Sequence, residues 1–143
     1  MNVVSVLAPV FVQVALTFIL CVRLGLLRVA ALKQGAARAS DVALGEPNWP
    51  PAVLKTGNAF RNQFELPVLF ILLVGLALQT DKADFLFIGL SWAFVVTRII
   101  HAVIHCGGND LRARLLAFGA GVLLLLLLWA RFALQLFLVS GSP

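Results

Sequence analysis

The chain has 143 residues, of which 62% are hydrophobic and only 12% are charged, with a net charge of +5. Soluble domains are about 45–50% apolar and about 25% charged, so this composition excludes an ordinary water-soluble globular protein. The basic residues are spread between apolar runs, which argues against nucleic-acid binding. The two cysteines do not make a disulfide framework, and the length corresponds to one domain.

Four apolar segments are long enough to cross a bilayer as helices. A hydrocarbon core about 30 Å thick needs roughly 20 helical residues. The segments at residues 3–30, 58–78, 85–105 and 115–138 meet this requirement. Strands are not expected, because these runs exceed the roughly ten-residue alternating segments of a membrane barrel. The sequence therefore predicts an all-α, integral membrane four-helix bundle that forms a single domain and has the lipid bilayer as its surroundings.

The predicted connections differ in length and in charge. The first, at residues 31–57, is the only long one, whereas residues 80–84 and 106–110 form short turns. Lysines and arginines gather at the first and third connections, which share one side of the membrane: Arg28, Lys33, Arg38, Lys55, Arg112 and Arg114. Because basic loops tend to stay in the cytoplasm, the long loop is predicted to be cytoplasmic and both termini to lie outside the cytoplasm.

Polar residues open the second segment on one helical face. They are spaced i, i+3, i+4 and i+7: Asn58, Arg61, Asn62 and Glu65. Pro67 follows two residues later and has no N–H, so the carbonyl of Gln63 loses its helical partner. The helix is therefore expected to loosen beside this polar face.

A second polar face lies on the third segment, where Arg98, His101 and His105 are spaced i, i+3 and i+7. At 1.5 Å per residue, Arg98 and Glu65 both lie about 10 Å below the same membrane surface. An unpaired arginine at depth costs at least about 2.5–3.5 kcal/mol, so these two side chains are predicted to be partners. Arg23 of the first segment falls in the same layer.

Two interpretations of these polar residues remain open. Intramembrane polar groups can simply hold helices together, so Asn62, Glu65 and Arg98 could form a buried latch without a ligand. The groups on this side are mostly cationic, however, which favours a pocket for an anionic, amphipathic ligand. His101 and His105 have a spacing that can hold a metal, but no further ligand pair completes a site, and no metal is predicted.

These residues resemble the motifs of the MAPEG family, the membrane-associated proteins of eicosanoid and glutathione metabolism. Arg61, Asn62 and Glu65 form an R-N-x-x-E motif, and residues 98–105 read R-x-x-H-x-x-x-H. Together with four spans and a long first cytoplasmic loop, the resemblance covers nearly the whole chain. The stretches NQFELPVLF and RIIHAVIH are similar to a bacterial branch of the family, which implies the bacterial inner membrane.

The resemblance implies a homotrimer with glutathione bound between neighbouring subunits near the cytoplasmic side, and with small hydrophobic or lipid-like substrates entering from the bilayer. It implies glutathione transferase or peroxidase activity on hydrophobic electrophiles. The residues expected to bind glutathione are Arg23, Asn58, Arg61, Asn62, Glu65, Arg98, His101 and His105. Arg112 or Arg114 falls where the family has its thiol-activating arginine, and a nearby guanidinium favours a thiolate.

The chain departs from the family pattern because it contains no tyrosine. Characterised glutathione-using members have a tyrosine at the end of the third helix, where this chain has His105. Some members have another near His101, and some have one just after the second-helix glutamate, where this chain has Leu66. The departure favours an alternative function: a non-catalytic MAPEG-like membrane protein that binds a lipid or an anion, or that serves as a scaffold.

Overall fold

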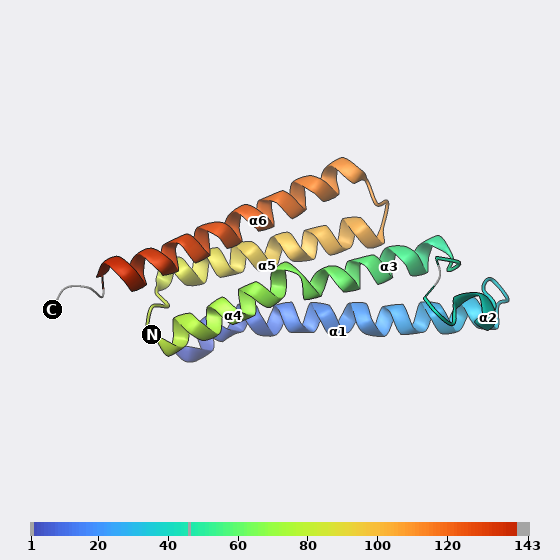
Figure 1. Ribbon diagram of the computed structural model, residues 1–143, viewed down its shortest axis with the longest axis horizontal. Helices are drawn as coiled ribbons and strands as arrows, with labels where there is room; N and C mark the ends of the chain where they lie inside the picture. The colour runs from blue at the N-terminus through green and yellow to red at the C-terminus, as the bar shows by residue number, and fades with distance from the viewer. Residues whose placement is uncertain (1, 46, 140–143) are drawn as a thin grey trace.

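The computed structural model describes residues 2–45 and 47–139, and the regular elements in these ranges are all helices. Four helical segments run alongside one another (Figure 1), each long and apolar enough to cross a membrane. They are α1 (Val3–Lys33), α3 followed by α4 (Pro51–Arg61 and Leu66–Gln79), α5 (Phe85–Cys106) and α6 (Leu111–Leu134). The predicted all-α integral membrane fold is confirmed, whereas the homotrimer stays a prediction.

The long connection is shorter than its predicted span of residues 31–57. Helix α1 continues to Lys33, and α3 begins at Pro51, so residues 51–57 are helical. Proline suits the first position of a helix because its fixed φ is helical and the missing N–H would have no partner there. Residues 34–50 form the connection, which includes the short helix α2 (Ala39–Val42).

Aspartate side chains start the last two spans. The Oδ1 atom of Asp84 accepts a hydrogen bond from the N–H of Phe87 at 2.9 Å, at the start of α5. Oδ1 of Asp110 accepts one from the N–H of Ala113 at 2.7 Å, so α6 begins earlier than the predicted residue 115. Each carboxylate satisfies an N–H group that has no partner within its own helix.

The second membrane segment is broken next to Pro67, as the sequence predicted. A 3-10 turn, η1 (Asn62–Phe64), separates α3 from α4, and Glu65 takes an irregular conformation with φ −97° and ψ −103°. The break places the Gln63 side chain inside the bundle. There its Oε1 accepts a hydrogen bond from Nε2 of Gln13 at 2.8 Å, and its Nε2 donates to the carbonyl of Ala59 at 2.9 Å.

The main apolar core fills the half of the bundle that is remote from α2. Its buried side chains include Phe70, Phe87, Phe94 and Leu128. At the same end, Arg131 of α6 pairs with Asp84, so an ion pair ties the start of α5 to the end of α6. Helix α6 then runs into the π-helical turn η2 (Gln135–Val139).

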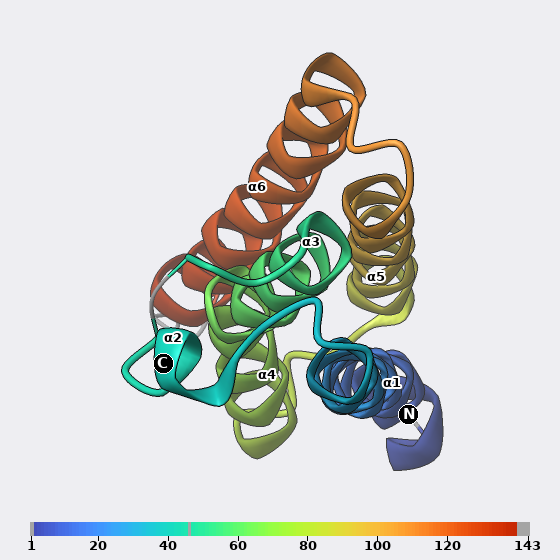
Figure 2. The same cartoon turned by 90° about the vertical axis from the view of Figure 1, so that its right-hand side faces the viewer.

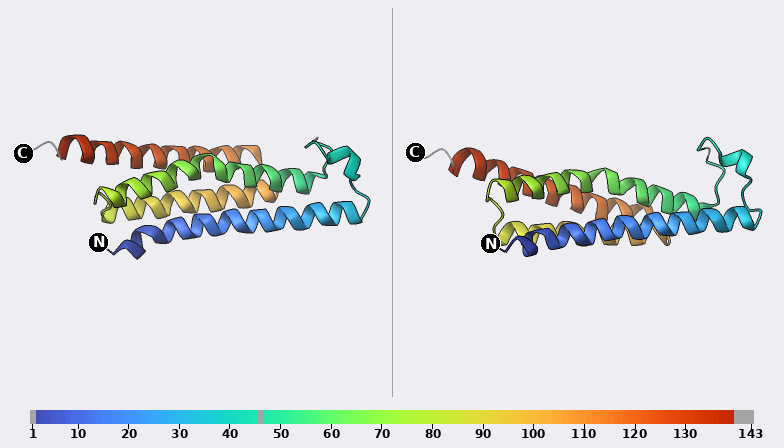
Figure 3. Two further views of the ribbon diagram at one scale, coloured as in Figure 1. Left: turned by 60° about the horizontal axis from the view of Figure 1, so that its bottom comes forward. Right: turned by 90° about the horizontal axis from the view of Figure 1, so that it is seen from below.

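The other end of the bundle is more open and more basic. The views along the axis and from the sides (Figures 2 and 3) show α6 diverging from α1 and α3 toward this end, and α1 extending past the α5–α6 turn. The end of α1, the start of α3 and the α5–α6 turn all lie at this end, so the basic residues of the first and third connections are gathered there. Whether that end faces the cytoplasm stays a prediction from the charge bias.

Candidate functional site

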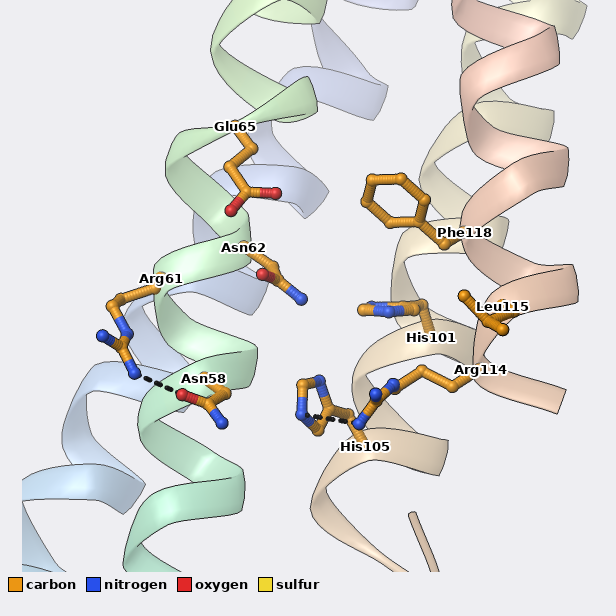
Figure 4. A pocket seen from close by; sticks show the side chains of 9 residues that line it. All are labelled: Asn58, Arg61, Asn62, Glu65, His101, His105, Arg114, Leu115 and Phe118. Carbon is orange, nitrogen blue, oxygen red and sulfur yellow. Dashed lines mark hydrogen bonds between the residues drawn. The ribbon is translucent and has the colours of Figure 1, made fainter. Parts of the chain in front are cut away.

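A cavity of about 430 Å³ lies at the basic end of the bundle, between the α3–η1–α4 segment and the pair α5 and α6. This volume is within the range of about 300–1,000 Å³ that is typical of small-molecule sites. Figure 4 shows the side chains around it. They are Asn58, Arg61, Asn62, Glu65, His101, His105, Arg114, Leu115 and Phe118.

Most of the predicted site residues meet at this cavity, but three do not line it. Arg23 lies on α1 in a separate, almost entirely apolar groove, beside Val22 and Leu26. Arg112 is exposed in the first turn of α6, outside the cavity lining. Arg98 is buried behind the cavity. Of the two arginines considered for thiol activation, the structure therefore places Arg114 at the cavity and Arg112 away from it.

The α3–α4 wall presents two amides, a guanidinium and a carboxylate. Figure 4 shows Asn62 and Glu65 directed toward the space that faces α5, whereas the Arg61 side chain turns to the outer side of α3. There a guanidinium nitrogen of Arg61 donates to the Oδ1 atom of Asn58. The η1 turn begins at Asn62 and ends just before Glu65, yet both residues line the cavity.

The opposite wall is a connected set of polar groups from α5, α6 and the turn between them. Nη1 of Arg114 lies 3.3 Å from Nε2 of His105 and donates to Oδ1 of Asn109 at 2.6 Å. The ring of His101 packs edge-on against that of His105, with centroids 5.6 Å apart, and lies 5.7 Å from the ring of Phe118. Arg114 is thus held by two neighbours beside the cavity.

A metal site is not assembled around the two histidines. Within residues 2–45 and 47–139, no group of three or more His, Cys, Asp or Glu side chains is placed to hold a metal ion. Nε2 of His105 faces the guanidinium of Arg114, which is a hydrogen-bond donor. The chemistry of this wall is therefore hydrogen bonding and positive charge.

The predicted pairing of Arg98 with Glu65 is wrong. Arg98 is 1% exposed, and its Nη2 donates to the backbone carbonyl of Ala117 on α6 at 3.2 Å, while its Nε has no partner. Glu65 is exposed and interacts with Arg98 only through the electrostatic field. Among the described residues, the carboxylate–guanidinium ion pair is the one at the far end of the bundle, between Asp84 and Arg131.

The Arg98 guanidinium occupies a niche that α6 provides. It lies over the rings of Phe94 and Phe118, with its central carbon 5.7 and 5.2 Å from their centroids. A Cβ atom at Gly121 would stand 2.6 Å from Nη2 of Arg98, so a larger residue there would force the buried guanidinium to shift. Depth along the helices placed Glu65 and Arg98 in one layer, but this contact with α6 directs the guanidinium away from Glu65.

Sequence reasoning missed three residues of the site. Leu115 and Phe118 are apolar residues in an apolar span, and no local pattern distinguishes them from lipid-facing neighbours. Asn109 is not among the residues that the sequence predicted for the site. Its signal is local, because an asparagine just after Gly107 and Gly108 at a helix end suits the left-handed conformation that it adopts here, with φ +57°.

The arrangement combines two guanidinium groups with one carboxylate and several amide and imidazole groups at one end of a membrane bundle. It suits a ligand that carries more negative than positive charge.

Comparison with known proteins identifies the family. A model of the MAPEG family matches residues 6–134. Searches of curated proteins and of solved structures each found no match. The family match begins in α1 and ends in α6, and so includes every residue that lines the cavity. The chain therefore belongs to the MAPEG family and is an integral membrane protein.

Proposed function

We propose that the cavity binds glutathione and that the protein is a glutathione-dependent membrane transferase or peroxidase acting on small hydrophobic electrophiles. The observation that carries this proposal is the gathering of Arg61, Arg114 and Glu65 with amide and imidazole groups around one cavity. Membership of the MAPEG family is consistent with such a function.

The lining residues fit the chemistry of glutathione. Glutathione carries two carboxylates, one ammonium group, two peptide groups and a thiol. Arg114 supplies positive charge for its anionic groups from within the cavity, Arg61 adds positive charge at the edge of the lining, and Glu65 supplies a carboxylate for the ammonium group. Asn58 and Asn62 can both donate to and accept from peptide groups. Two positive charges and one negative charge in the lining complement a ligand with a net charge of −1.

Glutathione, when bound, supplies the thiol that attacks an electrophile. Arg114 is the guanidinium that stabilises negative charge on the sulfur and so favours the thiolate. Asn62 and Glu65 orient the peptide backbone of glutathione. The thiol and the electrophile then react while both are bound in the cavity, and not after a chance encounter in solution. Leu115 and Phe118 form the apolar part of the lining, and the exposed Leu115 faces the surroundings from which a hydrophobic substrate enters.

We further propose that the protein acts as a homotrimer with the cavity on the cytoplasmic side of a bacterial inner membrane. Arg23 supports this packing, because it is exposed on α1 in an apolar groove beside Val22 and Leu26. An exposed guanidinium among apolar, lipid-facing side chains needs a counter-charge. A neighbouring subunit packed on the Arg23 groove would supply one.

Glutathione at millimolar concentration is expected to raise the unfolding temperature of the detergent-solubilised protein. A ligand at 100 times its Kd stabilises the folded state by about 2.7 kcal/mol. Glu65→Gln removes the carboxylate but keeps the size of the side chain, so it should unfold at the same temperature without ligand and respond less to glutathione. A folded wild type whose unfolding temperature is unchanged by millimolar glutathione would sink the proposal.

The alternative is a non-catalytic protein that uses the same cavity for a lipid or another anion. The observation that favours it is the absence of tyrosine, which leaves His105 at the position of a family tyrosine. Glutathione conjugation of a generic electrophile, measured in detergent or liposomes, separates the two functions. Turnover that is lost in Arg114→Ala excludes the alternative, whereas stabilisation by anionic lipid without turnover supports it.

A further inference from the structure

Asn109 links the end of α5 to the side chain of Arg114. It adopts a left-handed conformation with φ +57°, which asparagine tolerates better than most residues. Its backbone N–H donates to the carbonyl of Ile104 at 2.9 Å, and its Oδ1 accepts from Nη1 of Arg114 at 2.6 Å. One residue thus closes α5 with its backbone and holds a cavity residue of α6 with its side chain.

The turn that carries Asn109 is fixed at its neighbouring residues. Nζ of Lys55, from α3, donates to the carbonyl of Gly107 at 3.1 Å. Oδ1 of Asp110 accepts from the N–H of Ala113 at 2.7 Å and so caps α6. Asn109 is therefore presented from a turn that is tied to both α3 and α6, which gives its side chain a defined position relative to Arg114.

The contact with His105 adds a second constraint on the same nitrogen of Arg114. Nη1 of Arg114 lies 3.3 Å from Nε2 of His105. A guanidinium has only donors, so Nε2 must accept, and the ring proton of a neutral His105 lies on Nδ1. The two hydrogens of Nη1 are then used by Asn109 and His105, which leaves Nη2 and Nε of Arg114 for a ligand in the cavity (Figure 4).

We propose that Asn109 is a positioning residue that, together with His105, orients the Arg114 guanidinium toward the sulfur of bound glutathione. The inference rests on the proposed function. It assigns His105 a role of its own in this chain, because an imidazole acceptor beside Arg114 replaces the hydroxyl of the family tyrosine. Asn109 acts through Arg114 and is not itself expected to contact the ligand.

The test replaces Asn109 with glycine, which keeps the left-handed backbone and removes the side-chain acceptor. Asp81→Gly is the matched control, because Asp81 also has a positive φ, +55°, but lies in the turn at the opposite end of the bundle. Asn109→Asp keeps an acceptor oxygen and is the conservative rescue. The affinity for glutathione and the thiolate absorbance of bound glutathione are measured for the detergent-solubilised full chain.

Asn109→Gly is expected to weaken glutathione binding roughly tenfold and to lower the thiolate fraction, since one charge-assisted hydrogen bond is lost. Asp81→Gly should behave as the wild type in both measurements. Asn109→Asp should bind glutathione more tightly than Asn109→Gly, because it keeps the acceptor oxygen, but its added negative charge beside Arg114 should lower the thiolate fraction. A residue that only shapes the turn would instead leave both unchanged on replacement by glycine. Wild-type affinity and thiolate fraction in Asn109→Gly would therefore overturn the proposal.

A measurement on the ligand-free protein tests the positioning of Arg114 independently of glutathione binding. Nitrogen-15 NMR of labelled histidine reports which ring nitrogen of His105 is protonated, and His105→Gln identifies its signals. In the wild type Nε2 should be the acceptor, and Asn109→Gly should weaken that preference. If the wild type does not bind glutathione but this change occurs, the proposed function fails and the positioning of Arg114 stands. An unchanged His105 spectrum contradicts the positioning.

Discussion

Replacing Arg98 with methionine is expected to leave the bundle as stable as the wild type, or more stable by about 1 kcal/mol. The side chain is 1% exposed, makes one hydrogen bond to the carbonyl of Ala117, and leaves Nε without a partner. Removing a charge from membrane depth gains at least about 2.5–3.5 kcal/mol by insertion scales, which offsets the loss of one charged hydrogen bond, worth about 1.5–3 kcal/mol. Methionine can fill the space between Phe94 and Phe118.

The same substitution is expected to weaken glutathione binding. The Arg98 guanidinium lies over the ring of Phe118, which lines the cavity, so the substitution removes a positive charge close to an anionic ligand. Thermal unfolding in detergent and glutathione titration on the same preparations measure the two effects. A latch without a ligand makes the opposite prediction, since its removal would destabilise the helices and leave glutathione without effect. A drop in stability without any change in affinity would therefore favour the latch.

Replacing Gly121 with alanine is expected to lower the free energy of unfolding by about 1–3 kcal/mol relative to Gly119→Ala. A Cβ at position 121 would stand 2.6 Å from Nη2 of Arg98 and 2.9 Å from Oγ1 of Thr97. Position 119 has nothing within 4 Å of such an atom, so Gly119→Ala should keep the gain of about 1 kcal/mol that alanine brings to a helix. The comparison cancels the difference in helix propensity and leaves the clash.

The loss of unfolding free energy caused by Gly121→Ala should depend on the presence of the Arg98 guanidinium, which lies against Gly121. In an Arg98→Met background, Gly121→Ala is expected to cost much less, and the double-mutant cycle measures that coupling. Chemical or thermal unfolding of the four proteins in one detergent gives the numbers. Equal costs in both backgrounds would show that the niche on α6 does not constrain Arg98.

The sequence predicted the fold class because each span is a long apolar run, and length against bilayer thickness needs no tertiary information. The predicted start of the second helix at Asn58 is too late, because an apolar run marks the membrane-spanning part of a helix and not its polar first turns. Pro51 starts the helix seven residues before Asn58, about two turns earlier. The loosening beside Pro67 was predictable, since a missing N–H acts on the local backbone alone.

The cavity wall of α3 and α4 was also predictable, because periodic spacing brings Asn58, Asn62 and Glu65 to one side. The direction of Arg98 was not, since depth along two helices does not say which neighbour a long side chain reaches. That choice depends on the third partner, α6, where Gly121 leaves a niche. The hydrogen bond between Gln13 and Gln63 likewise joins residues whose contact only tertiary packing creates.

The most direct test of glutathione binding at this cavity is calorimetric titration of glutathione into the detergent-solubilised protein, with Arg114→Ala and Arg112→Ala measured alongside. The wild type is expected to bind glutathione saturably. Arg114→Ala, which removes a charged contact at the cavity, is expected to lose roughly 10- to 100-fold in affinity, and Arg112→Ala is expected to change little. A folded wild type that gives no saturable heat at millimolar glutathione, or equal losses in both arginine variants, would contradict binding at this cavity.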